Sequence, residues 1–342
     1  MSAPKGFTRR QFNSALLYGS AALALSGCSD NTSAGLDTTA DTASATYPPL
    51  KLSLAQWALQ TAQFGSTFND NYEQWQMWLK TDPAKVLQGE LSPMLFPEYV
   101  QQTFAIDAVD FVNTFYFDQV SNDAYWAELR QRCSDNNIVA NNIMLDQEGY
   151  LGHNNAAERL QAVENHKKWI DIAAKLNCAS VRVNAHGIGD WNSQLESALE
   201  SCTALADYAK ANNIVLLVEN HGGLSSNADW LVALMEQANH PALQVFLDYD
   251  NFKWSETEIW QTEQVYDRYE GVEKLMPYTH SVSVKTYEFD EAGNETTIDV
   301  PRMLEIAKRN NFAGYHSVEF EGHKGDPVTG IKQTRDLLLR AY

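Results

Sequence analysis

Eight short apolar segments recur along residues 50–342, and most of them end in a polar or charged residue. The clearest is residues 214–223, I-V-L-L-V-E-N-H-G-G, in which five apolar residues run into Glu219, an amide, His221 and two glycines. A continuous apolar run of this length predicts a strand that is buried on both faces. The predicted strands are residues 51–59, 108–113, 138–144, 179–184, 214–219, 243–248, 279–285 and 315–319.

The segments between these strands carry apolar residues at helical spacing. Predicted helices cover residues 72–79, 96–104, 123–135, 154–176, 192–211, 227–237, 257–275, 301–310 and 328–340. Strict alternation of strand and helix implies parallel pairing through right-handed crossovers. Eight repeats, in a segment close to the ~250 residues typical of this fold, predict a single-domain α/β protein, the (β/α)8 or TIM barrel.

Residues 60–95 follow the first predicted strand and are too long for an ordinary loop between a strand and a helix. They carry Trp75, Trp78 and Met94. We expect residues 72–79 to form a short helix. Its aromatic side chains either wall the mouth of the barrel or cover the core, and the pattern leaves both open.

The N-terminal 28 residues resemble an export signal. Residues 8–12 read T-R-R-Q-F, and paired arginines before a short apolar segment are typical of the twin-arginine route. L-S-G-C at residues 25–28 resembles a lipobox, which makes Cys28 the predicted lipidation site; the alternative is an ordinary cleaved signal with an incidental Cys28. Residues 29–49 are predicted as a disordered tether. We therefore expect a periplasmic protein that touches the membrane only through a lipid anchor at Cys28, in the outer membrane because Ser29 follows.

The chain is acidic, with 44 Asp and Glu against 25 Lys and Arg and a net charge of −19. Such a protein repels phosphate backbones, so we expect no nucleic-acid partner. Cys133, Cys178 and Cys202 are spaced too widely for a disulfide framework or a zinc knuckle. We expect buried thiols, with a Cys178–Cys202 pair as the alternative. The sequence does not indicate an oligomeric state.

Three of the last four predicted strands end in an acid, namely Glu219, Asp248 and Glu319. Because side chains alternate along a strand, parity places these acids together at the mouth formed by the carboxyl ends. Converging carboxylates repel one another unless they are protonated or neutralised, and a divalent cation would neutralise them. Oxygen ligands favour Mg²⁺ or Mn²⁺, and an added imidazole would widen the choice to Co²⁺ or Zn²⁺.

Four motifs carry a resemblance to a known family: V-E-N-H-G-G at residues 218–223, D-Y-D-N at 248–251, V-S-V-K at 282–285 and V-E-F-E-G at 318–322. Over nearly all of residues 50–342 the chain resembles the xylose isomerase-like barrels, the sugar phosphate isomerase/epimerase superfamily. The resemblance implies metal ligands at Glu219, Asp248 and Glu319. The superfamily often has a metal-binding histidine two residues before the lysine of strand seven, and here that position is Ser283. Parity turns the nearby His280 toward the helices, so it does not replace the missing ligand.

Further candidate site residues lie at or just beyond the strand ends. Lys285 is a candidate catalytic electrophile or hydroxyl anchor, and Glu219 and Glu319 are candidate acid–base groups. The candidate substrate-binding residues are Arg182, Asn184, His186, His221, Asn251 and Ser283. For the two histidines the alternative is a structural role. Glu321 and His323 are candidate rim residues.

These features predict a divalent-metal-dependent sugar isomerase or epimerase that removes a proton next to a carbonyl. Export and the absence of a glycine-rich phosphate loop favour a non-phosphorylated sugar or keto-sugar as the small-molecule substrate. Two alternatives stay open: a dehydratase or eliminase of a keto-glycoside, and a non-catalytic sugar-binding lipoprotein. A phosphodiesterase like endonuclease IV is disfavoured because it needs many histidines and a basic face.

Overall fold

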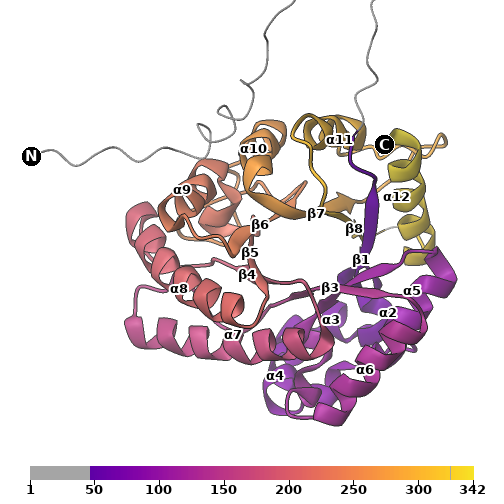
Figure 1. Ribbon diagram of the computed structural model, residues 1–342, viewed down its shortest axis with the longest axis horizontal. Coiled ribbons are helices and arrows are strands. Elements are labelled where there is room, and N and C mark those ends of the chain that lie inside the picture. The colour runs from indigo at the N-terminus through magenta and orange to yellow at the C-terminus, as the bar shows by residue number, and fades with distance from the viewer. Residues whose placement is uncertain (1–46, 324) are drawn as a thin grey trace, which may run out of the picture. The chain divides into compact units, whose positions relative to one another are not determined.

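The computed structural model describes residues 47–323 and 325–342, which close into a barrel of eight parallel strands in sequence order (Figure 1). The strands are β1 Lys51–Ala55, β2 Ala108–Val112, β3 Val139–Met144, β4 Ser180–Asn184, β5 Val215–Glu219, β6 Leu243–Asp248, β7 Thr279–Thr286 and β8 Tyr315–Phe320. The predicted TIM barrel is therefore confirmed. The expected export signal at 1–28 and most of the expected tether at 29–49 lie outside the described residues.

Helices surround the strands on the outside of the barrel (Figure 1). Their bounds are α2 Gln60–Phe64, α3 Thr67–Asp70, α4 Tyr72–Thr81, α5 Phe96–Phe104, α6 Asp123–Asp135, α7 Ala156–Leu176, α8 Trp191–Ala211, α9 Ala228–Ala238, α10 Arg268–Leu275, α11 Val300–Arg309 and α12 Pro327–Ala341. Many begin after an Asn or Asp whose side chain accepts backbone N–H groups of the first turn, as Asn155 does before α7 and Asp326 before α12. None of the helices in the described part is long and apolar enough to span a membrane.

Two predicted elements are shorter in the structure. The first strand ends at Ala55, and Gln56–Leu59 form a 3-10 turn because the buried Gln56 side chain bonds Gln63 and Tyr116. The helix predicted over 257–275 begins only at Arg268. Residues before it fold back on the chain after β6, where the N–H of Trp254 donates to the carbonyl of Gln264. This excursion carries residues 259 and 260 over the mouth of the barrel.

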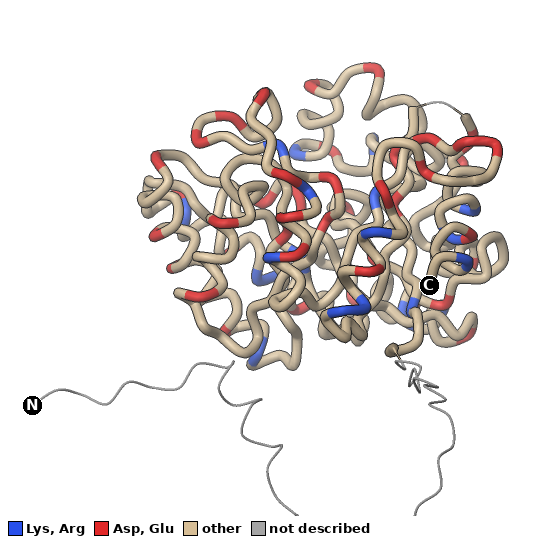
Figure 2. Tube along the Cα trace, turned by 90° about the horizontal axis from the view of Figure 1, so that it is seen from above, with Lys and Arg blue, Asp and Glu red and all other residues tan. Residues whose placement is uncertain are grey.

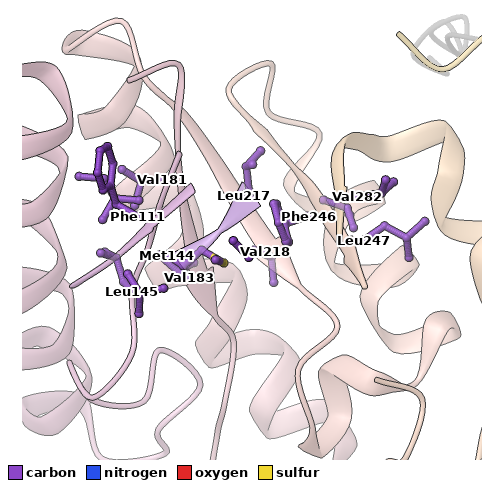
Figure 3. Packing of buried hydrophobic residues seen from close by; sticks show 14 of the residues in the cluster. Phe111, Met144, Leu145, Val181, Val183, Leu217, Val218, Phe246, Leu247 and Val282 are labelled. Atoms are coloured by element: carbon purple, nitrogen blue, oxygen red, sulfur yellow. The ribbon is translucent and has the colours of Figure 1, made fainter. Parts of the chain in front are cut away.

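The strands pack against the helices through alternating apolar side chains, several of which Figure 3 labels. Val181, Val183, Val218 and Val282 are fully buried. Each buried valine or leucine contributes about 1.5–3 kcal/mol relative to an exposed one. Cys133, Cys178 and Cys202 are buried and free, which confirms the expectation of buried thiols.

The inside of the barrel holds a polar group that the sequence analysis did not single out. Asp110 of β2 is fully buried and accepts hydrogen bonds from Ser53 of β1 at 2.5 Å, Ser317 of β8 at 2.6 Å and Asn141 of β3 at 2.6 Å. Burial raises the pKa of Asp110 to about 6, although the three donors oppose the shift. On the outside, Asp and Glu are spread among fewer Lys and Arg (Figure 2).

Candidate functional site

A cavity of about 450 Å³ lies at the carboxyl ends of the strands. Much of its polar lining comes from strand ends and the loops that follow them, including Asp146, Arg182, Asn184, His186, His221, Asn251, Lys285, Glu319 and Glu321. Its size falls within the range of small-molecule sites, roughly 300–1,000 Å³. A smaller cavity of about 250 Å³, between the residues after β7 and the start of α12, contains none of these strand-end groups.

Arg182 of β4 joins two of the acids at the floor of this cavity. Its Nη1 lies 2.9 Å from Oδ1 of Asp146, and its Nε lies 2.7 Å from Oε2 of Glu219. The Asn184 side chain donates to the same Asp146 oxygen at 2.8 Å. Burial by itself raises the pKa of Asp146, but the charge and hydrogen bond of Arg182, together with the hydrogen bond from Asn184, outweigh it and lower that pKa to about 2. Asp146 is therefore an ionised anchor for the guanidinium and a poor base.

Lys285 of β7 lies among three other acids. Its Nζ is 3.3 Å from Oδ2 of Asp248, 3.3 Å from Oε1 of Glu319 and 3.0 Å from Oε1 of Glu321. Burial lowers the pKa of Lys285, but these three carboxylates outweigh it and hold that pKa well above its ordinary value. Lys285 is thus a buried, charged ammonium group that still lines the cavity.

Strand register explains why these groups meet. Asp248 pairs with Ser283, and Lys285 pairs with Glu319, in the β6–β7 and β7–β8 ladders. The Ser283 hydroxyl donates to Oε2 of Glu319 at 2.5 Å. The predicted parity of strand seven is therefore seen in the structure, with Ser283 and Lys285 directed to the acids. His280 contacts the Ser281 hydroxyl instead, at 3.0 Å.

The acids differ in their access to the cavity. Glu319 and Glu321 line it, whereas Glu219, 2% exposed, and Asp248, fully buried, lie beneath its surface. Burial raises the pKa of Glu219, with Arg182 opposing and Asp248 adding to the rise. Burial likewise raises the pKa of Glu321, with Lys285 opposing. A substrate in the cavity would meet Glu319 and Glu321 first.

Hydrogen bonds from backbone N–H groups to the Asp248 side chain fix the conformation of the D-Y-D-N segment after β6. The N–H groups of Asp250 and Asn251 donate to Oδ1 of Asp248 at 2.7 and 2.8 Å. The Asn251 side chain then reaches Oε1 of Glu219 at 3.2 Å and also lines the cavity. Asn220 ties the segment to β5 by donating to the carbonyl of Asp248.

Two histidines stand at the side of the mouth. Nε2 of His186 donates to the carbonyl of His221 at 2.6 Å, so Nδ1 of His186 is left as an acceptor. Burial lowers the pKa of both rings, and Arg182 adds to the lowering at His221. Both are therefore neutral at pH 7. Nδ1 of His221 is buried without a hydrogen-bond partner in the described part of the chain, and the ring packs edge-on against Trp260 at 4.8 Å.

The two glycines after His221 serve backbone geometry. Gly222 has φ 78°, and a Cβ there would lie 2.5 Å from the carbonyl oxygen of Ile259. The Gly223 N–H donates to that same carbonyl at 2.9 Å. This close approach holds the 259–260 segment over the cavity.

The insertion after β1 forms an aromatic wall, which we define as Trp57, Phe68, Tyr72 and Trp75. All four line the cavity. Tyr72 and Trp75 stack with ring centroids 5.7 Å apart, and Phe68 packs edge-on against Trp57 at 5.2 Å. Trp75 is 1% exposed, so it covers core as well. Both open alternatives for this segment therefore hold.

Asp146 is not among the site residues predicted from the sequence, and Glu321 is predicted only as a rim residue. Asp146 lies two residues beyond β3, and an acid just after a predicted strand was the available signal. His323, the other rim candidate, is exposed and does not line the cavity.

The donor groups do not fit the metal site that the resemblance implies. A hard divalent cation needs several oxygen ligands about 2.0–2.6 Å from one point. Asp248 and Glu319 instead share the ammonium of Lys285, and Ser283 offers a hydroxyl where an imidazole was expected. Within residues 47–323 and 325–342, no group of three or more His, Cys, Asp or Glu side chains is placed to hold a metal ion.

Solved structures of the same shape include sugar-processing enzymes. L-ribulose 3-epimerase superposes with a TM-score of 0.61 at 14% identity, over 86% of this chain and 94% of that one. The 3-keto-D-glucoside 4-epimerase of E. coli gives 0.58 at 11% identity, over 73% and 94%. A xylose isomerase-like TIM barrel protein from Mycobacterium smegmatis in complex with magnesium gives 0.59 at 15% identity, over 86% and 96%. At these identities the likeness shows the fold alone.

Sequence comparison identifies the family, although it covers less of the chain than the structural matches do. The alpha subunit of a C-glycoside deglycosidase from Arthrobacter globiformis is 36% identical over 73 residues, which are 20% of this chain and 21% of that protein. The chain thus matches about a fifth of the length of that curated relative. A family model described as xylose isomerase-like TIM barrel matches residues 102–341. This match covers most of the chain and confirms the resemblance seen in the motifs, so the protein belongs to the xylose isomerase-like TIM barrel family.

Proposed function

We propose that the protein is an enzyme that removes a proton from carbon next to a carbonyl group of a non-phosphorylated sugar or keto-glycoside. One observation carries this proposal: the Lys285 ammonium lies 3.3 Å from Glu319 and 3.0 Å from Glu321, and all three groups line one cavity. A carboxylate base beside a fixed positive charge is the arrangement that enolate chemistry needs.

Glu319 is the base in this proposal. Its carboxylate takes the proton from carbon, the C–H bonding pair becomes the carbon–carbon double bond of the enolate, and the π pair of the carbonyl moves onto its oxygen. Lys285 stabilises the resulting oxyanion, and Arg182 adds a second positive charge at the cavity floor. Glu321, whose pKa burial raises, is placed to return the proton. Glu219, the other acid–base candidate from the sequence, is held by Arg182 beneath the surface and supports the guanidinium.

The fate of the enolate decides the reaction class. Return of the proton to the opposite face gives an epimer, and return to the neighbouring carbon gives an isomer. Loss of a β-substituent gives dehydration or glycoside cleavage. The names of the structural neighbours favour epimerisation, and the deglycosidase relative favours elimination from a keto-glycoside.

The cavity supports a glycoside rather than a free monosaccharide alone. Its aromatic wall offers flat apolar rings, on which an aromatic aglycone or a sugar ring can stack. The acids around its floor disfavour a phosphorylated substrate. His186, His221, Asn184 and Asn251 are placed to bind sugar hydroxyls from the side.

The expected divalent metal, whether Mg²⁺, Mn²⁺, Co²⁺ or Zn²⁺, would be held by Glu219, Asp248 and Glu319. The magnesium-bound neighbour holds such an ion, but the acids of this chain are not arranged for one. Because the ion pairs of Arg182 and Lys285 already use these acids, no step of the proposed reaction runs through a metal.

Export through the twin-arginine route, with a lipid anchor at Cys28, remains part of the proposal and would place the enzyme in the periplasm. Labelled fatty acid should enter the full chain and not the Cys28→Ala variant. Equal labelling of both chains would contradict a lipid anchor at Cys28.

The test is a panel of ketoses, 3-keto-glucosides and aryl glycosides of 3-keto-glucose, incubated with the full chain and followed by NMR for new sugar species. Conversion of at least one member, lost in Glu319→Gln, supports the proposal. Binding of a panel member by calorimetry without any conversion would favour the non-catalytic sugar-binding alternative.

A further inference from the structure

The ammonium group of Lys285 lies between carboxylates of the two neighbouring strands. Nζ is equidistant, at 3.3 Å, from Oδ2 of Asp248 on β6 and Oε1 of Glu319 on β8. Glu321, just beyond β8, supplies a third carboxylate at 3.0 Å. The cation at the centre of these acids is therefore part of the chain itself.

We propose that Lys285 takes the place of the divalent metal ion in this barrel mouth, so that the site is built to work without one. The chemical role of Lys285 rests on the proposed function, but its place among the acids does not. The surroundings of Asp248, Ser283 and Glu219 each support this assignment.

Asp248 has one oxygen committed to its own loop. Oδ1 accepts the backbone N–H groups of Asp250 and Asn251, which fixes the orientation of the carboxylate. Oδ2 is buried and has no hydrogen-bond partner in the described part of the chain, and it faces Nζ of Lys285. The remaining negative charge of Asp248 is thus directed at the ammonium.

Ser283 is paired with Asp248 in one ladder and with Ser317 in the next. Its hydroxyl donates to Oε2 of Glu319, which leaves Oε1 to face Lys285. Serine has no ring nitrogen to offer a shared metal, and its single hydroxyl proton is already donated to Glu319. The position that would complete a metal shell therefore serves to orient Glu319.

Glu219, the third expected ligand, has its own cation. Oε2 lies 2.7 Å from Nε of Arg182, and Oε1 accepts from Asn251 at 3.2 Å. Turning this carboxylate toward a shared metal would break a buried ion pair, which is strongly destabilising. The two chain cations, Arg182 and Lys285, thus divide between them the acids that one metal would gather.

This arrangement also narrows the substrate. A metal ion can hold a carbonyl oxygen and a neighbouring hydroxyl together, whereas an ammonium acts as a point charge. Lys285 therefore suits a substrate in which a single ketone oxygen takes up charge, as in a 3-keto-glycoside. Given the proposed function, we expect epimerisation or β-elimination next to a ketone rather than exchange between an aldose and a ketose.

The experiment measures metal binding directly. The full chain is purified without chelators, its metal content is determined by elemental analysis, and its thermal unfolding is followed with about 1 mM Mg²⁺, Mn²⁺, Co²⁺ or Zn²⁺. We expect well under about 0.2 metal ions per chain and a melting-temperature shift below about 1 °C with each ion.

Variants make the same measurement sharper. Lys285→Met removes the ammonium and leaves the acids unpaired, so we expect a lower melting temperature that Mn²⁺ restores by several degrees. The double variant with Ser283→His should respond to lower Mn²⁺ concentrations, because an imidazole joins the acids. If Lys285→Met does not fold, Lys285→Gln replaces it. The metal content of the wild-type chain tests the metal-free site whether or not either variant folds.

Two results would overturn the proposal. One is a wild-type chain that holds about one divalent ion, with EDTA removing the ion and lowering the melting temperature. The other is a folded Lys285→Met chain as insensitive to Mn²⁺ as the wild type. Measurements of turnover separate the two proposals. Conversion that occurs only with added metal supports the proposed function and contradicts the metal-free site. A chain that holds no metal and converts no substrate, with or without added metal, keeps the metal-free site and rejects the proposed function.

Discussion

Lys285 of β7 and Glu319 of β8 are paired residues of neighbouring strands, and their charged groups lie 3.3 Å apart at the floor of the cavity. Both are almost fully buried yet line the cavity. Because strands rather than loops hold them, the sheet register sets their separation. The proposed base and the charge that stabilises the oxyanion are thus held together by backbone pairing.

Replacing Glu319 by Gln should lower the rate of conversion by a factor of about 10²–10⁴, since a general base contributes that much to proton removal. The change keeps the side-chain size and removes the basic oxygen. The measurement is kcat/KM on the best substrate of the panel. Glu305→Gln, on the exposed face of α11, is the matched control and should leave the rate unchanged. Equal rates for the two variants would exclude Glu319 as the base.

Replacing Arg182 by Met should lower the free energy of unfolding by about 3–5 kcal/mol, because Asp146 and Glu219 would be left buried without their partner. Urea unfolding measures the loss. Arg132→Met is the control, since Arg132 pairs with Glu128 on the surface, and it should cost at most about 1 kcal/mol. Similar losses in the two variants would mean that the buried pairs do not stabilise the fold as described.

Asp110 gives the fold a defined pH dependence. Its pKa is about 6 in the folded protein, above the ordinary value near 3.8, so its contribution to stability is fully present at low pH and is lost as pH rises through 6. The wild type should therefore lose up to about 3 kcal/mol relative to Asp110→Asn between pH 4 and pH 7. Urea unfolding of both chains across this range measures the difference.

Ser317→Ala provides the matching comparison for Asp110. It removes one donor to the carboxylate, so the ionised form is less stabilised, and the total loss of stability with rising pH should become larger and extend to higher pH. A difference between wild type and Asp110→Asn that stays constant across the range would contradict the predicted pKa.

Gly222→Ala should destabilise the mouth more than Gly223→Ala. Both glycines have positive φ, which costs an alanine about 1 kcal/mol, but only at Gly222 would the new Cβ meet the Ile259 carbonyl, at 2.5 Å. At Gly223 nothing lies within 4 Å of it. Thermal unfolding compares the two variants, and faster proteolysis near residues 259–260 is expected for the first. Equal melting temperatures would show that the close approach is not required.

Tyr72→Ala tests the aromatic wall. Tyr72 lines the cavity and stacks on Trp75, so its loss should raise KM for aryl keto-glycosides by about five- to tenfold, as expected for one aromatic contact. The free keto-sugar serves as the control substrate and should keep its KM. A similar rise for both substrates would mean that Tyr72 does not contact the aglycone.

The barrel could be predicted because its signal is repeated. Eight apolar runs with helices between them specify parallel strands, and parity alone directs Glu219, Ser283 and Lys285 inward. The helix prediction for residues 257–267 was wrong because the helical spacing competes with a local pairing. In that pairing Lys253 and Val265 form an antiparallel bridge. Such pairing depends on the path that the chain takes after β6, and a local sequence pattern does not specify that path.

Strand-end positions predict many of the residues that line the cavity, but they predict neither Asp146 nor the pairings among the charged groups. The sequence places Arg182 on a strand, but only the fold shows that its fork joins Asp146, in one loop, to Glu219, on the next strand. Likewise, Ser283 was recognised as a departure from the family pattern. The Lys285 side chain also reaches Asp248 on the neighbouring strand. Residue spacing along the sequence does not predict such a contact between strands.

The central proposal is that Glu319 removes a proton from carbon next to a carbonyl while the Lys285 ammonium stabilises the resulting oxyanion. Its most direct test is the incorporation of solvent deuterium into a 3-keto-glucoside, followed by NMR with the EDTA-treated full chain. We predict exchange at the carbon next to the ketone, lost in Glu319→Gln and retained in Glu305→Gln. The absence of exchange with the wild type, for every keto-sugar that it binds and with or without added metal, would contradict the account.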